Sequence, residues 1–198
     1  MAFRVTTEPG VEPLTATEAR EACGYLDSDR DDELMLLVRA AVNVIESWEW
    51  RALITQTITL TIDKFPGTID PLYVPRPRLQ TVATLKYYDT DGVQQTWDAA
   101  NYQVDATTEP GRVRPAYGVV WPSTRLYFSS AVEMVYTAGY GDDPEDVPDN
   151  TRLLLRFLVN EFFTHPSTAA DYKVEELPHG IDALLRPCHD SRVLAFIR

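Results

Sequence analysis

Cysteine and histidine are scarce in this chain: its 198 residues include only two cysteines and three histidines. Cys23 and Cys188 lie far apart and form no CxxC pair, so we expect reduced, structural thiols rather than a disulfide framework. His165, His179 and His189 lack the i, i+4 pairing or the second carboxylate that zinc sites use. We therefore expect neither a metal site nor a cofactor.

Long apolar runs are also lacking. The two longest, residues 34–38 and 153–155, are cut by Arg39 and Arg156 and fall far short of the roughly 20 residues that span a bilayer. The opening residues contain no apolar core of signal-peptide length. With 44% hydrophobic residues, the sequence predicts a soluble globular protein, neither secreted nor membrane-bound, with one sizeable core or two small ones.

Positive charge is the third shortage. Eighteen basic residues face 30 acidic ones, which gives a net charge of -12 and argues against a surface that grips a phosphate backbone through counterion release. The acidity is concentrated near the N-terminus, where residues 1–50 carry 11 acids and four bases. We expect nucleic acid to pass such a surface without specific binding.

The first regular sequence patterns after the opening residues predict two helices. Thr15 and Glu18 form a capping-box pattern, which predicts a short first helix. Ser28 or Asp29 is expected to cap a longer second helix. The apolar positions of that helix recur at helical spacing, at Leu34, Leu37, Val38, Ala41, Ile45 and Trp48. Proline and glycine before the first cap predict a flexible arm over residues 1–13.

The middle of the chain carries strand signals. Threonine alternates with isoleucine or leucine through residues 55–62, which predicts a half-buried antiparallel strand. The run Asp89-Thr90-Asp91-Gly92 predicts a hairpin turn, and a calcium loop is disfavoured because no glutamate follows at the twelfth position. We expect one sheet of six or seven strands. Its strands would be residues 55–62, 72–74, 79–88, 93–97, 102–105, 112–114 and 132–136.

Helix signals return at Asp146 and Pro148, ahead of an apolar segment that stops at His165. Its crowded apolar residues are expected to be deeply buried; they are Leu153, Leu154, Phe157, Leu158 and Phe162. A further short helix is expected over residues 181–185. The predicted fold class is α+β, a helical bundle from the N- and C-terminal segments with an inserted antiparallel β-sheet domain. The expected divisions are a flexible arm (1–13), N-terminal helices (14–50), the β domain (51–147), C-terminal helices (148–185) and a C-terminal tail (186–198).

Patterns for catalysis are weak. Cys188 and His189 are adjacent, but neighbours in sequence rarely have the geometry of a nucleophile and its base. The acids from Asp142 to Asp146 suit the positive end of a helix dipole better than a divalent-ion site. No GxGxxG, GxxxxGKS/T or GxSxG motif occurs. Four tryptophans, ten tyrosines and proline-rich loops favour protein interfaces instead, so we expect no enzymatic activity.

Several stretches together resemble one known family. They are EPLT with EA at residues 12–19, WRALITQT at 50–57, VPRPRLQTV with YYDTDG at 74–92, and VYTAGYG at 135–141, supported by Tyr102, Pro110-Gly111-Arg112 and Trp121-Pro122. In order and spacing they are similar to the head-tail connector (adaptor) proteins of long-tailed bacteriophages and gene transfer agents, over most of the chain. The resemblance implies a structural virion protein without catalytic residues, assembled in the host cytoplasm. It would form a ring of identical subunits, and the expected number is twelve. The ring would lie beneath the portal, in the virion neck between capsid and tail, and would form part of the DNA channel.

Candidate contact residues fit that role. The C-terminal tail is the candidate portal-binding segment because arginines alternate with apolar residues there, at Arg186, Arg192, Val193, Leu194, Phe196, Ile197 and Arg198. The acids that open the second helix are candidates to line the channel, where they would let DNA slide; they are Asp29, Asp31, Asp32 and Glu33. Loops around Pro66, Asp91 and Trp121 are candidates for contacts with stopper or tail proteins.

Two alternatives stay open. Within the assembly class, the chain would be a stopper or tail-terminator neck protein, distinguished by the partner that it captures first. In a different class, it would be a small β-sandwich enzyme or a ligand-binding module. A pocket that gathers His179, Asp142 and Glu145 would indicate an enzyme, and an aromatic groove near Trp97 and Trp121 would indicate a sugar-binding module.

Overall fold

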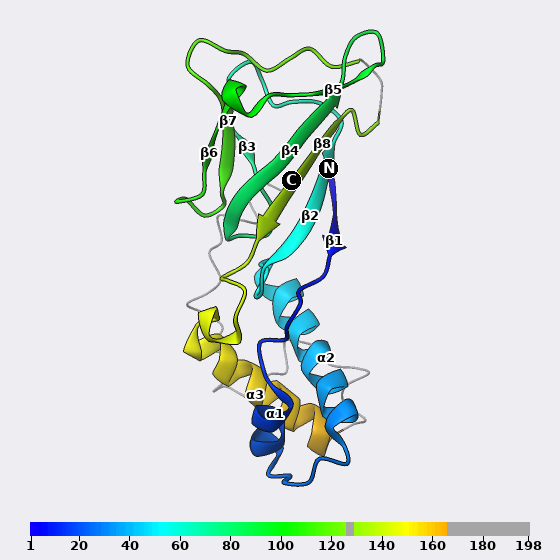
Figure 1. The fold of residues 1–198 in the computed structure, drawn as a ribbon, viewed down its shortest axis with the longest axis vertical. Helices are drawn as coiled ribbons and strands as arrows, with labels where there is room; N and C mark the ends of the chain where they lie inside the picture. The colour runs from blue at the N-terminus through cyan, green and yellow to red at the C-terminus, as the bar shows by residue number, and fades with distance from the viewer. Residues whose placement is uncertain (126–128, 166–198) are drawn as a thin grey trace. The chain divides into compact units, whose positions relative to one another are not determined.

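The computed structural model describes residues 1–125 and 129–165. These residues fold as two compact units, each of which combines segments that are distant in sequence (Figure 1). The sheet unit comprises residues 1–9, 55–125 and 129–140, and the helical unit comprises residues 10–54 and 141–165. The α+β class is confirmed. From sequence we expect domain borders at 50/51 and 147/148, whereas the chain passes between the units at 54/55 and 140/141.

The helical unit is built on three helices that contact one another pairwise. They are α1 (Ala16–Cys23), α2 (Asp31–Glu49) and α3 (Asp149–Thr164). Apolar positions at helical spacing place one side of each long helix in a common core. The core residues of α2 and α3 include Leu34, Val38, Ala41, Ile45, Leu154, Leu155, Leu158 and Phe162. No helix in the described ranges is long and apolar enough to span a membrane.

The predicted capping box at the start of α1 is confirmed. The Thr15 amide donates to a carboxylate oxygen of Glu18 at 3.0 Å, and the Glu18 amide donates to the Thr15 hydroxyl oxygen at 3.2 Å. Two amides that the first turn would leave unpaired are therefore satisfied. Gly24 ends the helix with a φ of 64°, a left-handed conformation that glycine adopts without strain.

The start of α2 differs from expectation. Neither Ser28 nor Asp29 is its cap; the N-cap residue is Arg30, and its side chain makes no capping bond. Asp29 instead accepts a hydrogen bond from the Tyr25 hydroxyl at 2.8 Å, and Ser28 accepts the Asp31 amide through its carbonyl. The acidic first turn of α2 still suits the positive end of the helix dipole.

The third helix follows a short 3₁₀ turn, η2 (Pro144–Asp146), and ends with His165 as its C-cap, as predicted. The expected deep burial is wrong for two of its residues, because Leu153 and Phe157 are 44% and 47% exposed. These two residues lie one turn apart, on a side of α3 that the other two helices leave open. The helix predicted over residues 181–185 lies outside the described residues.

The sheet unit contains two antiparallel sheets rather than the single sheet that we expected. One has five strands in the order β1-β2-β8-β4-β5, and the other has three in the order β3-β7-β6. The strands are β1 (Ala2–Thr7), β2 (Gln56–Ile62), β3 (Leu72–Tyr73), β4 (Leu79–Tyr88), β5 (Gln94–Thr96), β6 (Tyr102–Asp105), β7 (Arg112–Pro115) and β8 (Val132–Ala138). The alternation of apolar and polar residues along a strand indicates which face is buried, but it does not indicate which strand pairs with it.

The flexible arm predicted over residues 1–13 is wrong for its first part. Residues 2–7 form β1, which pairs with β2 at one edge of the five-stranded sheet. The alternation of Phe3 and Val5 with Arg4 follows the strand period, but the segment is too short for this signal to outweigh the proline and glycine that follow it. The beginning of the chain therefore completes a sheet whose other strands come from residues 56–138.

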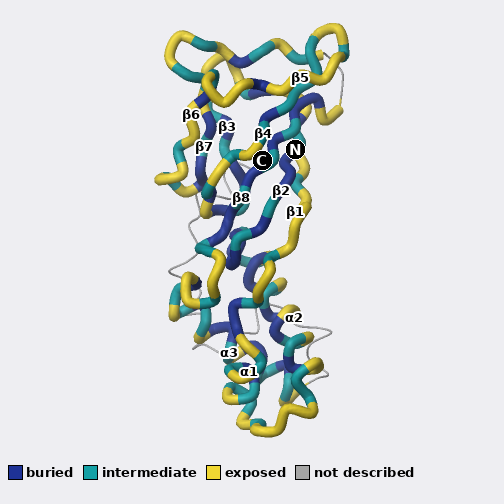
Figure 2. The backbone as a smooth tube through the Cα atoms, in the orientation of Figure 1, coloured by how far each residue is buried: buried dark blue, intermediate teal, exposed yellow. Residues whose placement is uncertain are grey.

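Both sheets contribute to one core. The Tyr136 hydroxyl on β8 donates to the Pro75 carbonyl at 2.7 Å. Gly111, just before β7, lies so close to β4 that an added Cβ would come within 2.5 Å of the Leu79 Cβ. Buried backbone follows β2 and β8 in Figure 2. The fully buried side chains of this unit include Ile58, Leu60, Leu85, Val113, Met134 and Tyr136.

Candidate interaction surfaces

The four acids proposed to line a channel lie together at the start of α2, but only some keep their charge uncompensated. Asp31 lies 3.3 Å from Arg20, and Glu33 accepts two hydrogen bonds of 2.7 Å from Arg30, which lower its pKa. Asp29 accepts a bond from a tyrosine hydroxyl. Asp32 is exposed and makes no hydrogen bond or ion pair with any described residue.

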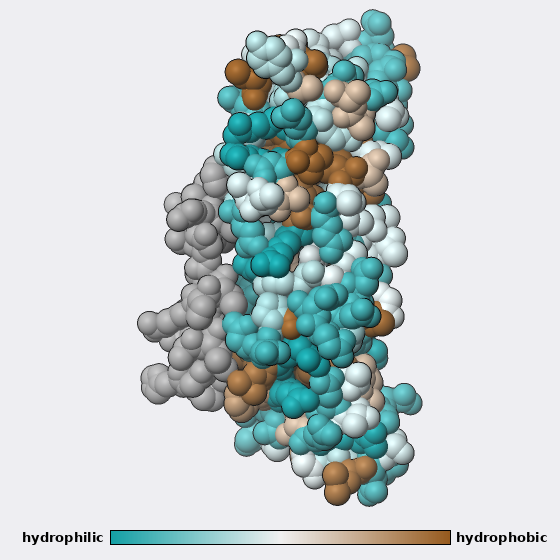
Figure 3. Space-filling model, turned by 60° about the vertical axis from the view of Figure 1, so that its left-hand side comes forward, coloured by the Kyte–Doolittle hydropathy of each residue, from teal (hydrophilic) through white to brown (hydrophobic). Residues whose placement is uncertain are grey.

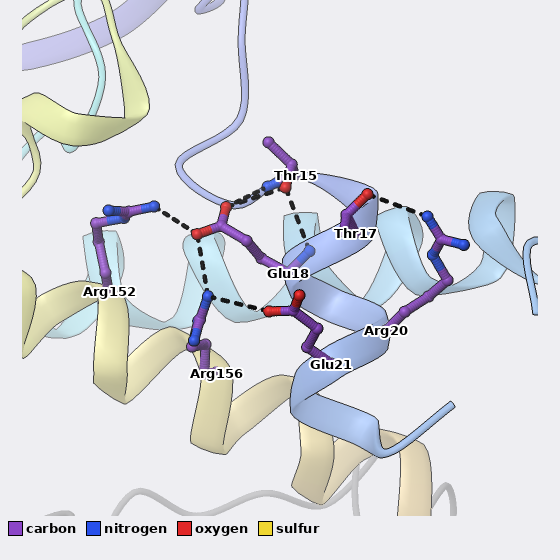
Figure 4. A network of polar contacts seen from close by, with 7 residues as sticks. All are labelled: Thr15, Thr17, Glu18, Arg20, Glu21, Arg152 and Arg156. Atoms are coloured by element: carbon purple, nitrogen blue, oxygen red, sulfur yellow. Dashed lines mark hydrogen bonds and ion pairs between the residues drawn. The ribbon is translucent and has the colours of Figure 1, made fainter. Parts of the chain in front are cut away.

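A second polar network, which the sequence did not single out, joins α1 to α3 (Figure 4). Arg152 donates to Glu18 at 2.6 Å, and Arg156 donates to the same carboxylate at 3.1 Å. Burial alone would raise the pKa of Glu18, but its hydrogen bonds from Thr15 and the two arginines outweigh that effect and lower it. The two arginines stand at i, i+4 on α3, a spacing that signals a shared face but not the partner on another helix.

Within residues 10–54 and 141–165 the helical unit has six lysine or arginine residues, all of them arginines in ion pairs within that unit. The pairs are Arg20–Asp31, Arg30–Glu33, Arg39–Glu12, Arg51–Glu49, Arg152–Glu18 and Arg156–Glu18. The described part of this unit has 16 acids against these six bases, a formal charge of -10. No cation of the described unit is therefore left to meet an outside anion, while many carboxylates are.

The sheet unit has a different balance. Its described residues carry nine acids and eight bases, a formal charge of -1. Five of its bases form no ion pair with any described residue; they are Arg4, Lys64, Lys86, Arg114 and Arg125. The negative charge of the described residues is thus concentrated in the helical unit. Counting acids and bases along the sequence shows this only in part, because residues 1–9 belong to the sheet unit.

One face of the five-stranded sheet is covered by threonine. Strand register places Thr57, Thr59 and Thr61 of β2 on the same side as threonines of β4 and β8, because paired residues point to the same face. Two hydroxyl pairs cross the strands, Thr6 with Thr59 at 2.6 Å and Thr81 with Thr137 at 2.8 Å. We call this surface the threonine face; its members are Thr6, Thr7, Thr57, Thr59, Thr61, Thr81, Thr84 and Thr137.

The loop residues proposed for tail-side contacts separate into exposed and buried ones. Asp91 is exposed at the confirmed hairpin turn, where Asp89 accepts the Asp91 and Val93 amides, and Pro66 is half-buried. Trp121 does not present its ring to a partner, because it is only 6% exposed. Its ring stacks on Phe65 at 4.6 Å between centroids.

An aromatic cluster accounts for this burial. Trp97 lies 4.9 Å from Trp121 and 5.6 Å from Tyr102 between ring centroids, and Trp121 donates through Nε1 to the Asp70 carbonyl at 2.8 Å. Trp97 is 8% exposed, so the groove for sugar stacking that we considered at Trp97 and Trp121 is not formed. The cluster holds two loops and β6 together instead.

Apolar side chains are nonetheless exposed on loops of the sheet unit. They are Ile69, Val93, Tyr117 and Val120, each at least 54% exposed. On the face drawn in Figure 3, hydrophobic residues form small separate groups among hydrophilic ones. The loops therefore offer isolated apolar contacts rather than one broad apolar surface.

Other sequence candidates lie outside the described ranges. They include the whole portal-binding set (Arg186, Arg192, Val193, Leu194, Phe196, Ile197 and Arg198), Cys188, His179 and His189. Asp142 and Glu145 are exposed beside η2, and their proposed pocket with His179 stays a prediction. Within residues 1–125 and 129–165, no three histidine, cysteine or acidic side chains gather as a metal site.

Comparison with known proteins gives structural matches only. No protein-family model matches the sequence, and no curated protein matches it. The fold is similar to a chain in the neck of an empty gene transfer agent particle computed with C6 symmetry, with a TM-score of 0.79 and 22% identity. It is also similar to a chain in the virion of a native gene transfer agent particle (0.76, 23%) and to one in a native neck computed with C12 symmetry (0.70, 22%). Each match covers 97% of this chain and 97% of the other chain.

Proposed function

We propose that the chain is a structural subunit of the neck of a bacteriophage or gene transfer agent particle. In this proposal it is the adaptor, a ring beneath the portal that joins head to tail and encloses part of the DNA channel. The observation that carries the proposal is the fold shared over 97% of both chains with proteins of gene transfer agent necks and virions. The independent resemblance of residues 12–19, 50–57, 74–92 and 135–141 to connector proteins supports it.

Twelve copies are the proposed ring number. The similar chains belong to neck structures computed with C6 and with C12 symmetry. A ring with twelvefold symmetry also obeys sixfold symmetry, so both descriptions suit twelve subunits. A ring needs two different complementary faces on each subunit, because only a heterologous interface closes into a cycle of more than two.

The charge distribution suits passage of DNA without binding. The described part of the helical unit has a formal charge of -10, and each of its arginines is paired within the unit. Where acids such as Asp32 face the channel, they repel the duplex over about one Debye length, roughly 8 Å at physiological salt. A channel lined by unpaired lysine or arginine would hold DNA instead, through counterion release.

The test is reconstitution with a portal. The purified chain is mixed with the cognate portal protein, and the mass of the complex is measured by light scattering and native mass spectrometry. We expect a complex with twelve copies of the chain per portal ring, and a truncation after Pro187 that no longer binds. A chain that stays apart from the portal but joins a preformed portal-adaptor complex would be a stopper. A chain that binds neither assembly refutes the proposal.

A further inference from the structure

We infer that the threonine face of the sheet unit is the surface on which the helical unit of a neighbouring copy docks. This inference rests on the proposed ring of copies and names the two faces that meet in it. It begins from the composition of the threonine face, on which the threonines lie beside Arg4, Lys86 and Glu133.

The threonine face is ordered before any partner arrives. The hydroxyl of Thr6 on β1 pairs with that of Thr59 on β2, and the hydroxyl of Thr81 on β4 pairs with that of Thr137 on β8, so each pair is held across two neighbouring strands. Threonine has few rotamers to lose. Docking on this face therefore costs little conformational entropy.

The charges on this face are mostly positive and uncompensated. Arg4 is the register partner of Thr59, and Lys86 is the register partner of Glu133, so all four lie on this side of the sheet. Neither Arg4 nor Lys86 forms an ion pair with a described residue. A partner that brings carboxylates and no free cation complements this arrangement.

The helical unit of a second copy is such a partner. Among its residues 10–54 and 141–165, the six arginines are already paired, and the excess of ten acids includes the exposed Asp32, which has no described partner. Two threonine faces that met each other would bring Arg4 and Lys86 of both copies together, which repels them. The heterologous contact is the one that also closes a ring.

The size of the face sets the strength of the contact. Four strands about 4.8 Å apart and about seven residues long, at about 3.3 Å per residue, cover roughly 440 Å². A standard interface buries about 800 Å² on each partner. The threonine face thus supplies about half of a stable interface, so we expect free copies to associate weakly and the ring to close when a portal arrays them.

Charge reversal with a matched control tests this inference. Arg4→Glu places a carboxylate on the threonine face, whereas Arg114→Glu makes the same change at an exposed, unpaired arginine of the other sheet. We expect Arg4→Glu to weaken ring assembly on the portal by roughly tenfold or more, and Arg114→Glu to leave it unchanged. Circular dichroism verifies that both variants fold, and Arg4→Gln supplies a milder second variant.

Zero-length crosslinking locates the partner face directly. Rings assembled from equal amounts of isotopically light and heavy chain are treated with a carbodiimide, which joins a lysine to a contacting carboxylate. We expect mixed-isotope crosslinks from Lys86 to acids of residues 10–54 or 141–165, and none from Lys64 in its exposed loop.

The outcomes separate the two proposals. If the wild-type chain forms no ring with the portal, the proposed function fails. If the wild type forms rings and Arg4→Glu assembles as well as Arg114→Glu, the inference is overturned while the function stands. Lys86 crosslinked only to the sheet unit of another copy also overturns it.

Discussion

Glu18 offers the sharpest test of how the helical unit is held together. It closes the capping box of α1 with Thr15 and accepts hydrogen bonds from Arg152 and Arg156 of α3. Its side chain is only 20% exposed. Loss of the cap costs about 1 kcal/mol. Loss of the charge-assisted bonds costs about 1–2 kcal/mol more at such a partly buried site.

Two substitutions at Glu18 separate these contributions. Glu18→Ala removes both the cap and the charge, and we expect it to lower the free energy of unfolding by about 2–3 kcal/mol. Glu18→Gln keeps the shape and a capping acceptor but loses the charge, so about 1 kcal/mol is expected. Glu21→Gln is the control, because Glu21 is 61% exposed and lies 3.9 Å from Arg156. It should change stability by less than about 0.5 kcal/mol.

The same residue gives a pH dependence with a defined sign. The pKa of Glu18 in the folded chain lies below its ordinary value of 4.5. Its charged form therefore contributes stability above about pH 4.5, and that contribution disappears as pH falls through the lowered pKa. Urea unfolding followed by far-UV circular dichroism should show a smaller gap in stability between wild type and Glu18→Gln at pH 3 than at pH 7. Equal gaps at both pH values, or a Glu21→Gln effect as large as that of Glu18→Gln, would refute this reasoning.

Three further predictions concern the sheet unit. Trp121→Ala should destabilise it by about 3–5 kcal/mol in urea unfolding, whereas Tyr117→Ala, at a fully exposed loop position, should leave stability unchanged within about 0.5 kcal/mol. Tyr136→Phe should lower the free energy of unfolding by about 1–2 kcal/mol in the same assay, because it leaves a buried carbonyl unpaired. Burial raises the pKa of Tyr136, so its hydroxyl should stay protonated in an alkaline absorbance titration. Hydrogen bonds from Thr107 and an arginine lower the pKa of Asp105 to about 2, and an NMR titration should show this value rise in Thr107→Ala.

Local contacts explain which parts of the fold were predictable. The Thr15–Glu18 box, the Asp89–Gly92 turn and the strand over residues 79–88 depend on residues within one segment, and all three are confirmed. The cap of α2 was wrong because Asp29 bonds to the nearby Tyr25 instead of to the helix. Several acceptors compete for the same few donors there, and sequence alone does not rank them.

The candidate surfaces were less predictable. The loop around Trp121 was expected to contact a partner protein, yet Phe65 and Trp97 from other parts of the chain pack against the Trp121 ring. The threonines of β2 were identified as one polar face, but the matching threonines of β4 and β8 join them only through strand register. The proposed role of residues 186–198 stays a prediction.

The sequence by itself determined the local elements of this protein, its excess of acids and the resemblance that suggested a neck component. These depend on spacing within a few residues and on composition. Only the tertiary structure decided that residues 2–7 complete the five-stranded sheet, that the eight strands of the described residues form two sheets, and that Arg152 and Arg156 of α3 pair with Glu18 of α1. Each of those outcomes depends on which distant segments meet, since a strand edge or a guanidinium group can pair with many partners.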